Sequence, residues 1–173
     1  NPVPRTMGQS ATVMPATPAV VPIASTNRCA SVASTPGSCM LAQAKNAIEL
    51  YADPSNRAGY RDRLAALASR LLADAAPGSD HQLSFARAFA AAARTPEHAA
   101  VVRSWLSGDA PDGLAIDTDL RWTLLQRLIA LGAADEAEID TELESDDTAT
   151  GLRQAAQARA AIPTAEAKER AYA

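Results

Sequence analysis

Hydrophobic positions beyond residue 40 recur every three or four residues, which is the spacing of amphipathic α-helices. The pattern is clearest between Asp117 and Gly132. One set of large apolar residues falls on a single helical face, and a second set falls on the adjacent face (Leu120, Leu124, Leu128 and Leu131; Trp122, Leu125 and Ile129). A helix with two apolar faces is expected to pack against neighbours on two sides. Asp117 or Thr118 is suited to cap its start, and Gly132 to end it.

The same periodicity predicts about eight helices joined by short connections. Prolines and glycines separate the segments, and polar residues suited to capping precede several of them. The first four expected helices cover about Met40–Ala52, about Asn56–Ala75, a segment after the S-x-x-Q capping box Ser79–Gln82, and a segment that begins at Thr95-Pro96. The next three cover 117–132, about Asp135–Ser145, and Thr150–Ala161, the last of these after a cap at Asp147 or Thr148. The eighth follows a cap at Thr164. We therefore expect an all-α, antiparallel helical-hairpin array similar to HEAT or armadillo solenoids, without a strict repeat.

The buried side of each helix follows from the same spacing. Apolar residues that share a face are expected to form the core: Leu41, Ala44, Ile48 and Tyr51; Tyr60, Leu64, Leu67, Leu71 and Leu72; Leu83, Phe85, Ala86 and Phe89; Val101, Val102, Trp105 and Leu106. In the acidic helix 135–145, only Ile139 and Leu143 are expected to be buried, and the carboxylates are expected to form a solvated face. The Ala-rich segment 150–161 should let neighbouring helix axes approach closely.

Residues 1–40 differ from the rest of the chain. They contain six of the eleven prolines and both cysteines, but only two charged residues, Arg5 and Arg28. Such a composition, without periodicity, predicts an irregular or disordered segment. We therefore expect two parts, an irregular segment 1–40 and a helical domain 41–173.

Composition limits the possible functions. The 173-residue chain is 47% hydrophobic but only 4% aromatic, and its net charge is −4. This charge argues against nucleic-acid binding, which normally requires a basic patch. There is no apolar run long enough to span a membrane and no signal-peptide pattern, so no membrane partner is expected. Two cysteines are too few for a disulfide framework, and they fit a reducing compartment such as the cytoplasm or carry no information.

Candidate chemistry is sparse. The zinc-peptidase motif H-E-x-x-H is absent, because His81 and His98 are 17 residues apart and neither precedes a glutamate. Each of these histidines lies in the first turn of an expected helix, and we expect both to face solvent. Adding Cys29 and Cys39 produces no known metal-ligand spacing. There is no G-x-S-x-G motif, and the carboxylates from Asp135 to Asp147 are best interpreted as a solvated helix face. We therefore assign no catalytic, cofactor-binding or metal-binding residue, and we interpret Trp105 and Trp122 as core residues.

Several runs carry a family resemblance. DTDLRWTLLQRLIALG, AEID, DDTATG and ARAAIPTAEAK, together with PGSDHQLSFARAFAAAA upstream, resemble the C-terminal helical domain of bacterial aminopeptidase N from about Leu41 onward. That family comprises gluzincin-type zinc metalloaminopeptidases. The resemblance implies a helical domain that lies against a catalytic domain, encloses the active-site cavity and limits access to peptides with free N-termini. Zinc would belong to the parent enzyme, and the family's H-E-x-x-H and G-x-M-E-N residues have no counterpart here.

Three hypotheses follow. The first is a non-catalytic piece of a zinc aminopeptidase, truncated at both ends, whose partners are the catalytic domain of the same polypeptide and peptide substrates. The second is a stand-alone helical-repeat module that binds peptide or protein. The third, an enzyme in its own right, would require hydrolysis of aminoacyl anilides by this chain, which we do not expect. Arg121 is either an ion-pair partner that ties a helix start to its neighbour or a basic group facing the peptide cavity.

Overall fold

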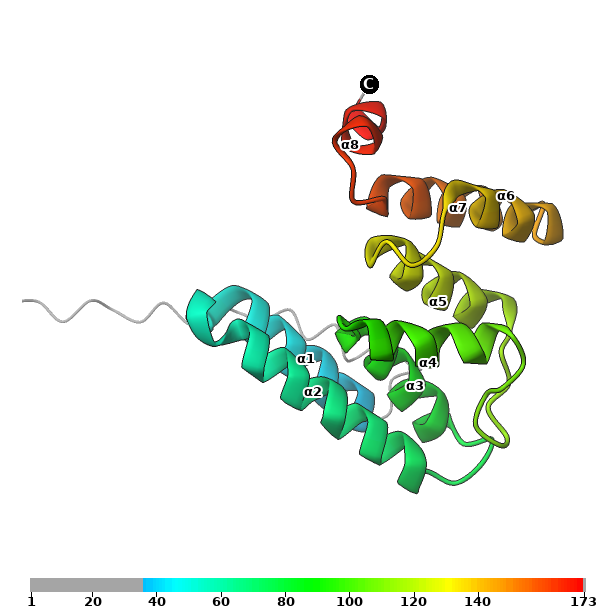
Figure 1. Ribbon diagram of the computed structural model, residues 1–173. Helices are drawn as coiled ribbons and strands as arrows, with labels where there is room; N and C mark the ends of the chain where they lie inside the picture. Colours follow the sequence, from blue (N-terminus) through cyan, green and yellow to red (C-terminus); the bar gives the residue numbers. More distant parts are fainter. Residues whose placement is uncertain (1–35, 173) are drawn as a thin grey trace, which may run out of the picture.

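The computed structural model describes residues 36–172, and within that range all regular secondary structure is α-helical. The helices are α1 (Pro36–Tyr51), α2 (Pro54–Asp74), α3 (Asp80–Ala92), α4 (Pro96–Leu106), α5 (Thr118–Ala130), α6 (Glu136–Ser145), α7 (Ala149–Ala161) and α8 (Ala165–Tyr172). Helices α1 to α7 run back and forth in an antiparallel array, and α8, which is seen nearly end-on, crosses the direction of α7 (Figure 1). The expected all-α helical-hairpin architecture is confirmed.

The caps that position these helices are largely those that the sequence indicates. At Thr95, Asp117 and Thr164, a side-chain oxygen accepts a hydrogen bond from the backbone N–H three residues later, at 3.3, 2.8 and 3.3 Å. Of the two candidates before α7, Thr148 is the cap. Gly132 follows α5 with a φ of 69°, a conformation that costs glycine little. Local chemistry therefore sets most helix starts.

The first helix begins earlier than expected. α1 starts at Pro36, four residues before Met40, so the end of the predicted irregular segment is helical. Proline fits the first turn of a helix because the backbone N–H that it lacks would be unsatisfied there. The remainder of that segment, including Cys29, lies outside the described residues.

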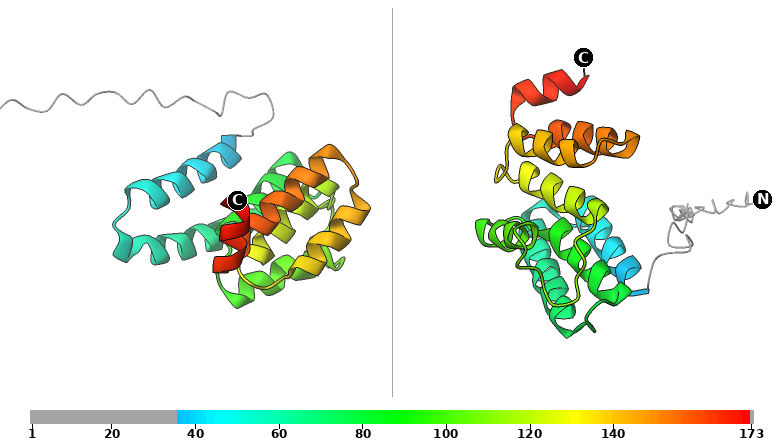
Figure 2. Two further views of the ribbon diagram at one scale, coloured as in Figure 1. Left: turned by 90° about the horizontal axis from the view of Figure 1, so that it is seen from above. Right: turned by 90° about the vertical axis from the view of Figure 1, so that its right-hand side faces the viewer.

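The helices form two layers. The odd-numbered helices pack in succession, α1 on α3, α3 on α5 and α5 on α7. Each even-numbered helix packs on an odd-numbered one, whereas successive even-numbered helices make no comparable contact with each other in the described part of the chain. The right-hand view of Figure 2 shows α1 and α4 on opposite sides of the array. One side of the molecule is thus built from spaced helices over a continuous layer.

The predicted two-sided packing of α5 is confirmed. Leu120, Leu124 and Leu128 belong to a core cluster formed with α1–α4 (with Leu64, Leu72, Phe85, Phe89 and Val102 among its members). The adjacent face of α5 belongs to a second cluster, shared with α6 and α7 (Trp122, Leu125, Ile129, Ile139, Ala155 and Ala158). α5 is therefore the structural centre of the array.

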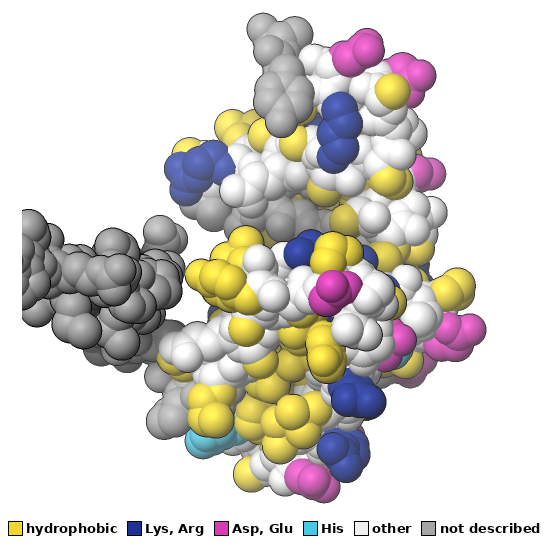
Figure 3. Space-filling model, turned by 90° about the vertical axis from the view of Figure 1, so that its left-hand side faces the viewer, with side chains coloured by type: hydrophobic (Ala, Val, Ile, Leu, Met, Phe, Trp, Pro, Cys, Tyr) yellow, Lys and Arg dark blue, Asp and Glu magenta, His cyan; other side chains and the backbone are white. Residues whose placement is uncertain are grey.

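Predictions for the outer edge of α1 and α2 are partly wrong. Tyr51, Tyr60 and Leu67 were expected to be buried, but they are 74%, 42% and 37% exposed. The reason lies in α2, where Ala65 and Ala68 are fully buried and allow close packing against α3, which turns the larger side chains outward. Figure 3 shows hydrophobic side chains gathered in the lower half of the molecule, where α1 and α2 lie.

The S-x-x-Q box before α3 is only half formed. Ser79 Oγ accepts from the backbone N–H of Gln82 at 3.1 Å, as predicted. The Gln82 side chain does not return to Ser79, however. It accepts from the N–H of Gly78 at 2.8 Å and donates to the carbonyl of Asp112 at 2.8 Å. A buried glutamine therefore ties the α2–α3 turn to the α4–α5 loop.

Candidate functional site

The spacing of the even-numbered helices leaves three grooves on one side of the array. Each groove lies between two successive even-numbered helices, and the odd-numbered helix between them forms its floor. The groove between α2 and α4 has a volume of about 230 Å³, that between α4 and α6 about 220 Å³, and that between α6 and α8 about 340 Å³. These grooves are the candidate functional site.

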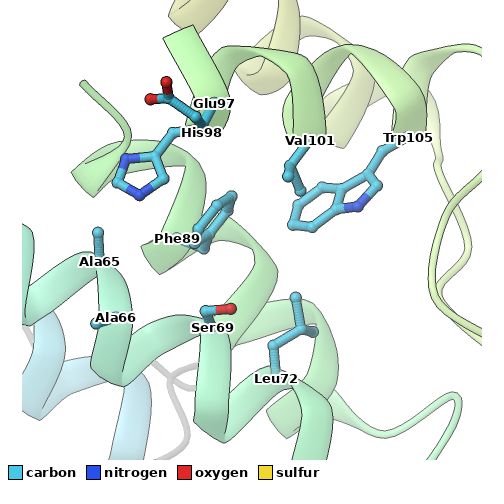
Figure 4. Close-up of a pocket in the computed structure, with 9 residues that line it drawn as sticks. All are labelled: Ala65, Ala66, Ser69, Leu72, Phe89, Glu97, His98, Val101 and Trp105. Atoms are coloured by element: carbon cyan, nitrogen blue, oxygen red, sulfur yellow. The ribbon is translucent and has the colours of Figure 1, made fainter. Parts of the chain in front are cut away.

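The α2–α4 groove is aromatic. Phe89 of α3 lies with its ring centroid 5.4 Å from that of His98 and 5.5 Å from that of Trp105. Val101, which was expected in the core, is 40% exposed and lines the groove wall. Figure 4 shows these side chains converging over α2, while the carboxylate of Glu97 points away from Phe89. The groove is suited to hold an apolar side chain.

The two histidines differ in their surroundings. His81 is exposed, as expected. His98 was also expected to face solvent, but it is half-buried in the α2–α4 groove, and its Nδ1 accepts from the backbone N–H of Arg94 at 3.4 Å. Among the described residues, no three His, Cys, Asp or Glu side chains lie close enough together to hold a metal ion.

The α4–α6 groove is lined by two ion pairs. Arg121 donates from Nε and Nη2 to the two carboxylate oxygens of Glu142, at 2.8 and 2.7 Å. Arg103 pairs with Glu138 across the same groove. Hydrogen bonding to these carboxylates raises the pKa of both guanidinium groups. Arg121 thus ties α5 to α6, as one of its two interpretations predicted.

The solvated acidic face predicted for α6 is wrong at one position. Glu142 is only 7% exposed. It lies three residues after the buried Ile139, on the face that packs against α5, and the bidentate Arg121 compensates its charge. The spacing of carboxylates alone did not distinguish this buried acid from its solvated neighbours.

The α6–α8 groove combines small side chains with charge. Its floor and far wall are rich in alanine (Ala156, Ala160, Ala167 and Ala171). Arg159 donates to Asp140 at 2.6 Å and lies 3.7 Å from Glu136, which is 3.5 Å from Arg170. The charges in this groove are balanced.

The two tryptophans have different roles. Trp122 is 1% exposed, and its indole N–H donates to Asp146 Oδ2 at 2.8 Å, so its interpretation as a core residue is confirmed. Trp105 is 5% exposed and belongs to the core, but it also forms part of the α2–α4 groove wall.

The three grooves differ in the surfaces that they present. The α2–α4 groove is apolar, the α4–α6 groove is lined by ion pairs and the α6–α8 groove is rich in alanine. Such a succession of surfaces suits contact with a polypeptide.

None of the helices that the structure describes is both long enough and apolar enough to cross a bilayer.

Comparison with known proteins adds two findings. Residues 28–173 match the model of the family described as ERAP1-like C-terminal domain. The chain is also 48% identical over 131 residues to aminopeptidase N from Streptomyces lividans. That alignment covers 75% of this chain but only 15% of the length of the aminopeptidase.

Proposed function

This chain belongs to the ERAP1-like C-terminal domain family, and from that premise we propose that it is the non-catalytic, C-terminal helical portion of a zinc-dependent aminopeptidase that removes N-terminal residues from peptides. In this proposal the helical array encloses the active-site cavity and limits substrate access. The observation that carries the proposal is the 48% identity to aminopeptidase N over most of this chain.

The grooved side of the array supports a role in contacting polypeptide. Grooves between helices commonly bind ligands or extended segments in α-solenoids. The α2–α4 groove offers an aromatic floor, and the α4–α6 groove offers paired charges with hydrogen-bonding capacity. We place either the catalytic domain of the same polypeptide or the peptide substrate against this side.

Zinc would be held elsewhere in the parent enzyme. The described residues do not fit a zinc site, since no three potential ligands converge and the sequence contains no H-E-x-x-H. The catalytic step therefore cannot be derived from this chain. Its contribution would be to bind, orient or exclude, through the packing of its helices.

Two experiments test the proposal. Reading the coding DNA upstream of this chain should reveal an H-E-x-x-H in the same reading frame. The purified chain, with or without added zinc, should hydrolyse no aminoacyl anilide above background. Turnover by this chain alone, or an upstream frame without the motif, would contradict the proposal.

A second candidate function is a stand-alone helical-repeat module that binds peptide or protein. The succession of grooves on one side favours it. The sequence of the same gene distinguishes the two functions. A start codon and a stop codon immediately around this chain, together with expression of the chain on its own, would support the stand-alone module. In that case the grooves would serve a separate partner rather than a catalytic domain.

A further inference from the structure

A cluster of arginines lies at one end of the array, beside the α2–α4 groove, since the backbone N–H of Arg94 donates to His98 of that groove. Arg61 of α2 and Arg94 of the α3–α4 connection both reach Glu49 of α1, the former by a hydrogen-bonded ion pair and the latter at 3.6 Å. Arg127 of α5 donates from Nε to the carbonyl of Ala93 at 2.7 Å, and Ala93 is the residue before Arg94, so the two guanidinium groups lie at the same end of the array. Figure 3 looks onto the end of the molecule toward which α1 and α5 run.

The charge of this cluster is not balanced. The guanidinium groups of Arg61 and Arg94 share the single carboxylate of Glu49, and Lys45 and Arg127 add further positive charge around it without an ion pair to it. The other ion pairs of the described residues are matched in number: Arg87 with Asp119, Arg103 with Glu138, Arg121 with Glu142, and Arg159 and Arg170 with Glu136 and Asp140. A local surplus of positive charge is notable in a chain with a net charge of −4.

Two of the arginines have donors available. Arg94 is 43% exposed, and its guanidinium makes no hydrogen bond among the described residues, only the 3.6 Å ion pair. Arg127 donates from Nε and Nη2 to the carbonyl of Ala93, which leaves its Nη1 group without a partner in the described part of the chain. Burial and the proximity of Arg94 both lower the pKa of Arg127. An anion placed here would relieve that repulsion.

We propose that Arg94 and Arg127, supported by Arg61, form a binding site for one oxyanion, a carboxylate or a phosphate group. The planar fork of a guanidinium matches two oxygens of such a group, and two forks, one from the α3–α4 connection and one from α5, can hold it together. Glu49 orients Arg61 and Arg94 but competes with the ligand for them. The site is independent of the proposed aminopeptidase function, because it requires only this chain.

The test follows arginine Nε–H signals in two-dimensional NMR spectra of the full chain. Sodium phosphate and sodium acetate are titrated separately, each against sodium chloride at equal ionic strength. The Nε–H signals of Arg94 and Arg127 should shift and saturate with phosphate or acetate, whereas that of Arg70, an exposed arginine on α2, should not. Saturation by phosphate alone identifies a phosphate site, and saturation by acetate as well identifies a site that accepts carboxylates.

Two variants are expected to change the affinity for phosphate in opposite directions, which separates a role of these residues in binding from a purely structural one. Arg94→Gln should weaken phosphate binding about twofold to fivefold, the range of a half-exposed ion pair. Glu49→Gln should tighten it by a similar factor, because it removes the competing carboxylate. Arg70→Gln is the matched control for lost charge and should leave binding unchanged. The proposal is overturned if the Nε–H signals of Arg94 and Arg127 shift without saturation and by no more than the signal of Arg70. It is also overturned if Glu49→Gln binds phosphate more weakly than the wild type.

Discussion

Gly151→Ala tests how closely α7 packs against the turn that precedes it. Gly151 is buried in the first turn of α7. A Cβ atom at this position would lie 2.8 Å from Cγ and Oδ2 of Asp146 and closer still to its carbonyl oxygen. Asp146 cannot easily move away, because its carboxylate accepts hydrogen bonds from Trp122 and from Thr148, each at 2.8 Å.

The expected change in the free energy of unfolding is the sum of two opposing contributions. Overpacking of this kind typically costs about 1–3 kcal/mol. The higher helix propensity of alanine returns at most about 1 kcal/mol, and less in a first turn. We therefore expect the free energy of unfolding to fall by about 1–2 kcal/mol. The matched control is Gly59→Ala in α2, where, apart from its chain neighbours and the backbone of its own helix, no atom of the described residues lies within 4 Å of the added Cβ. That substitution should stabilise the protein by about 0.5–1 kcal/mol.

The assay is urea unfolding of the wild type and both variants, followed by far-UV circular dichroism at one protein concentration. The two substitutions are chemically identical, yet we expect them to shift the unfolding midpoint in opposite directions. A Gly151→Ala variant as stable as the wild type, or both variants shifted upward, would refute the account of the α6–α7 packing.

Three further predictions use the same unfolding assay. Trp122→Phe should cost about 1–3 kcal/mol more than Trp105→Phe, because only the first loses an indole hydrogen bond to a carboxylate; equal losses would contradict this. Glu142→Gln should destabilise the protein by about 1 kcal/mol, and more than Glu138→Gln, since the Glu142 side chain is 9% exposed and the Glu138 side chain 37%. The reverse order would be evidence against a role for burial. The pKa of Glu49 is lowered by its hydrogen bond to arginine, so the stability that this carboxylate provides is present above its ordinary value of 4.5 and is lost as the pH falls through the lowered value. Glu49→Gln should therefore flatten the loss of stability below that pH, and an unchanged slope would exclude the effect.

Much of the fold could be predicted because its signals are local. The caps at Thr95, Asp117 and Thr164 depend on residues within one turn, and the sequence displays them directly. The two faces of α5 could be predicted for a related reason. Seven large apolar residues on adjacent faces leave few ways to bury them, and the two core clusters follow.

The errors arise where tertiary packing decides the outcome. Tyr60 and Leu67 share the helical spacing of buried residues, but Ala65 and Ala68 give α2 a closer contact surface against α3. Glu142 is buried because an arginine from another helix compensates it, and that pairing spans 21 residues of sequence. The acidic character of α6 concealed it.

The grooves were beyond prediction from the sequence for the same reason. Their walls come from helices that do not pack on each other, and their floors come from helices between them. His98 was expected at the surface because it lies in a first turn, and only the position of Phe89 places it in a groove. The arginine cluster likewise draws on three helices and a connection.

The most direct measurement of the central claim is sedimentation of this chain with an aminopeptidase N from which the matching C-terminal region has been deleted. If the array is a scaffold that packs against the catalytic domain of such an enzyme, this chain and the shortened aminopeptidase should form a one-to-one complex. Val101→Asp in the α2–α4 groove should weaken that complex, whereas the control Leu152→Asp should not. Leu152 is an exposed leucine of α7 outside the grooves. If the two proteins sediment independently at all concentrations tested, the claim is contradicted.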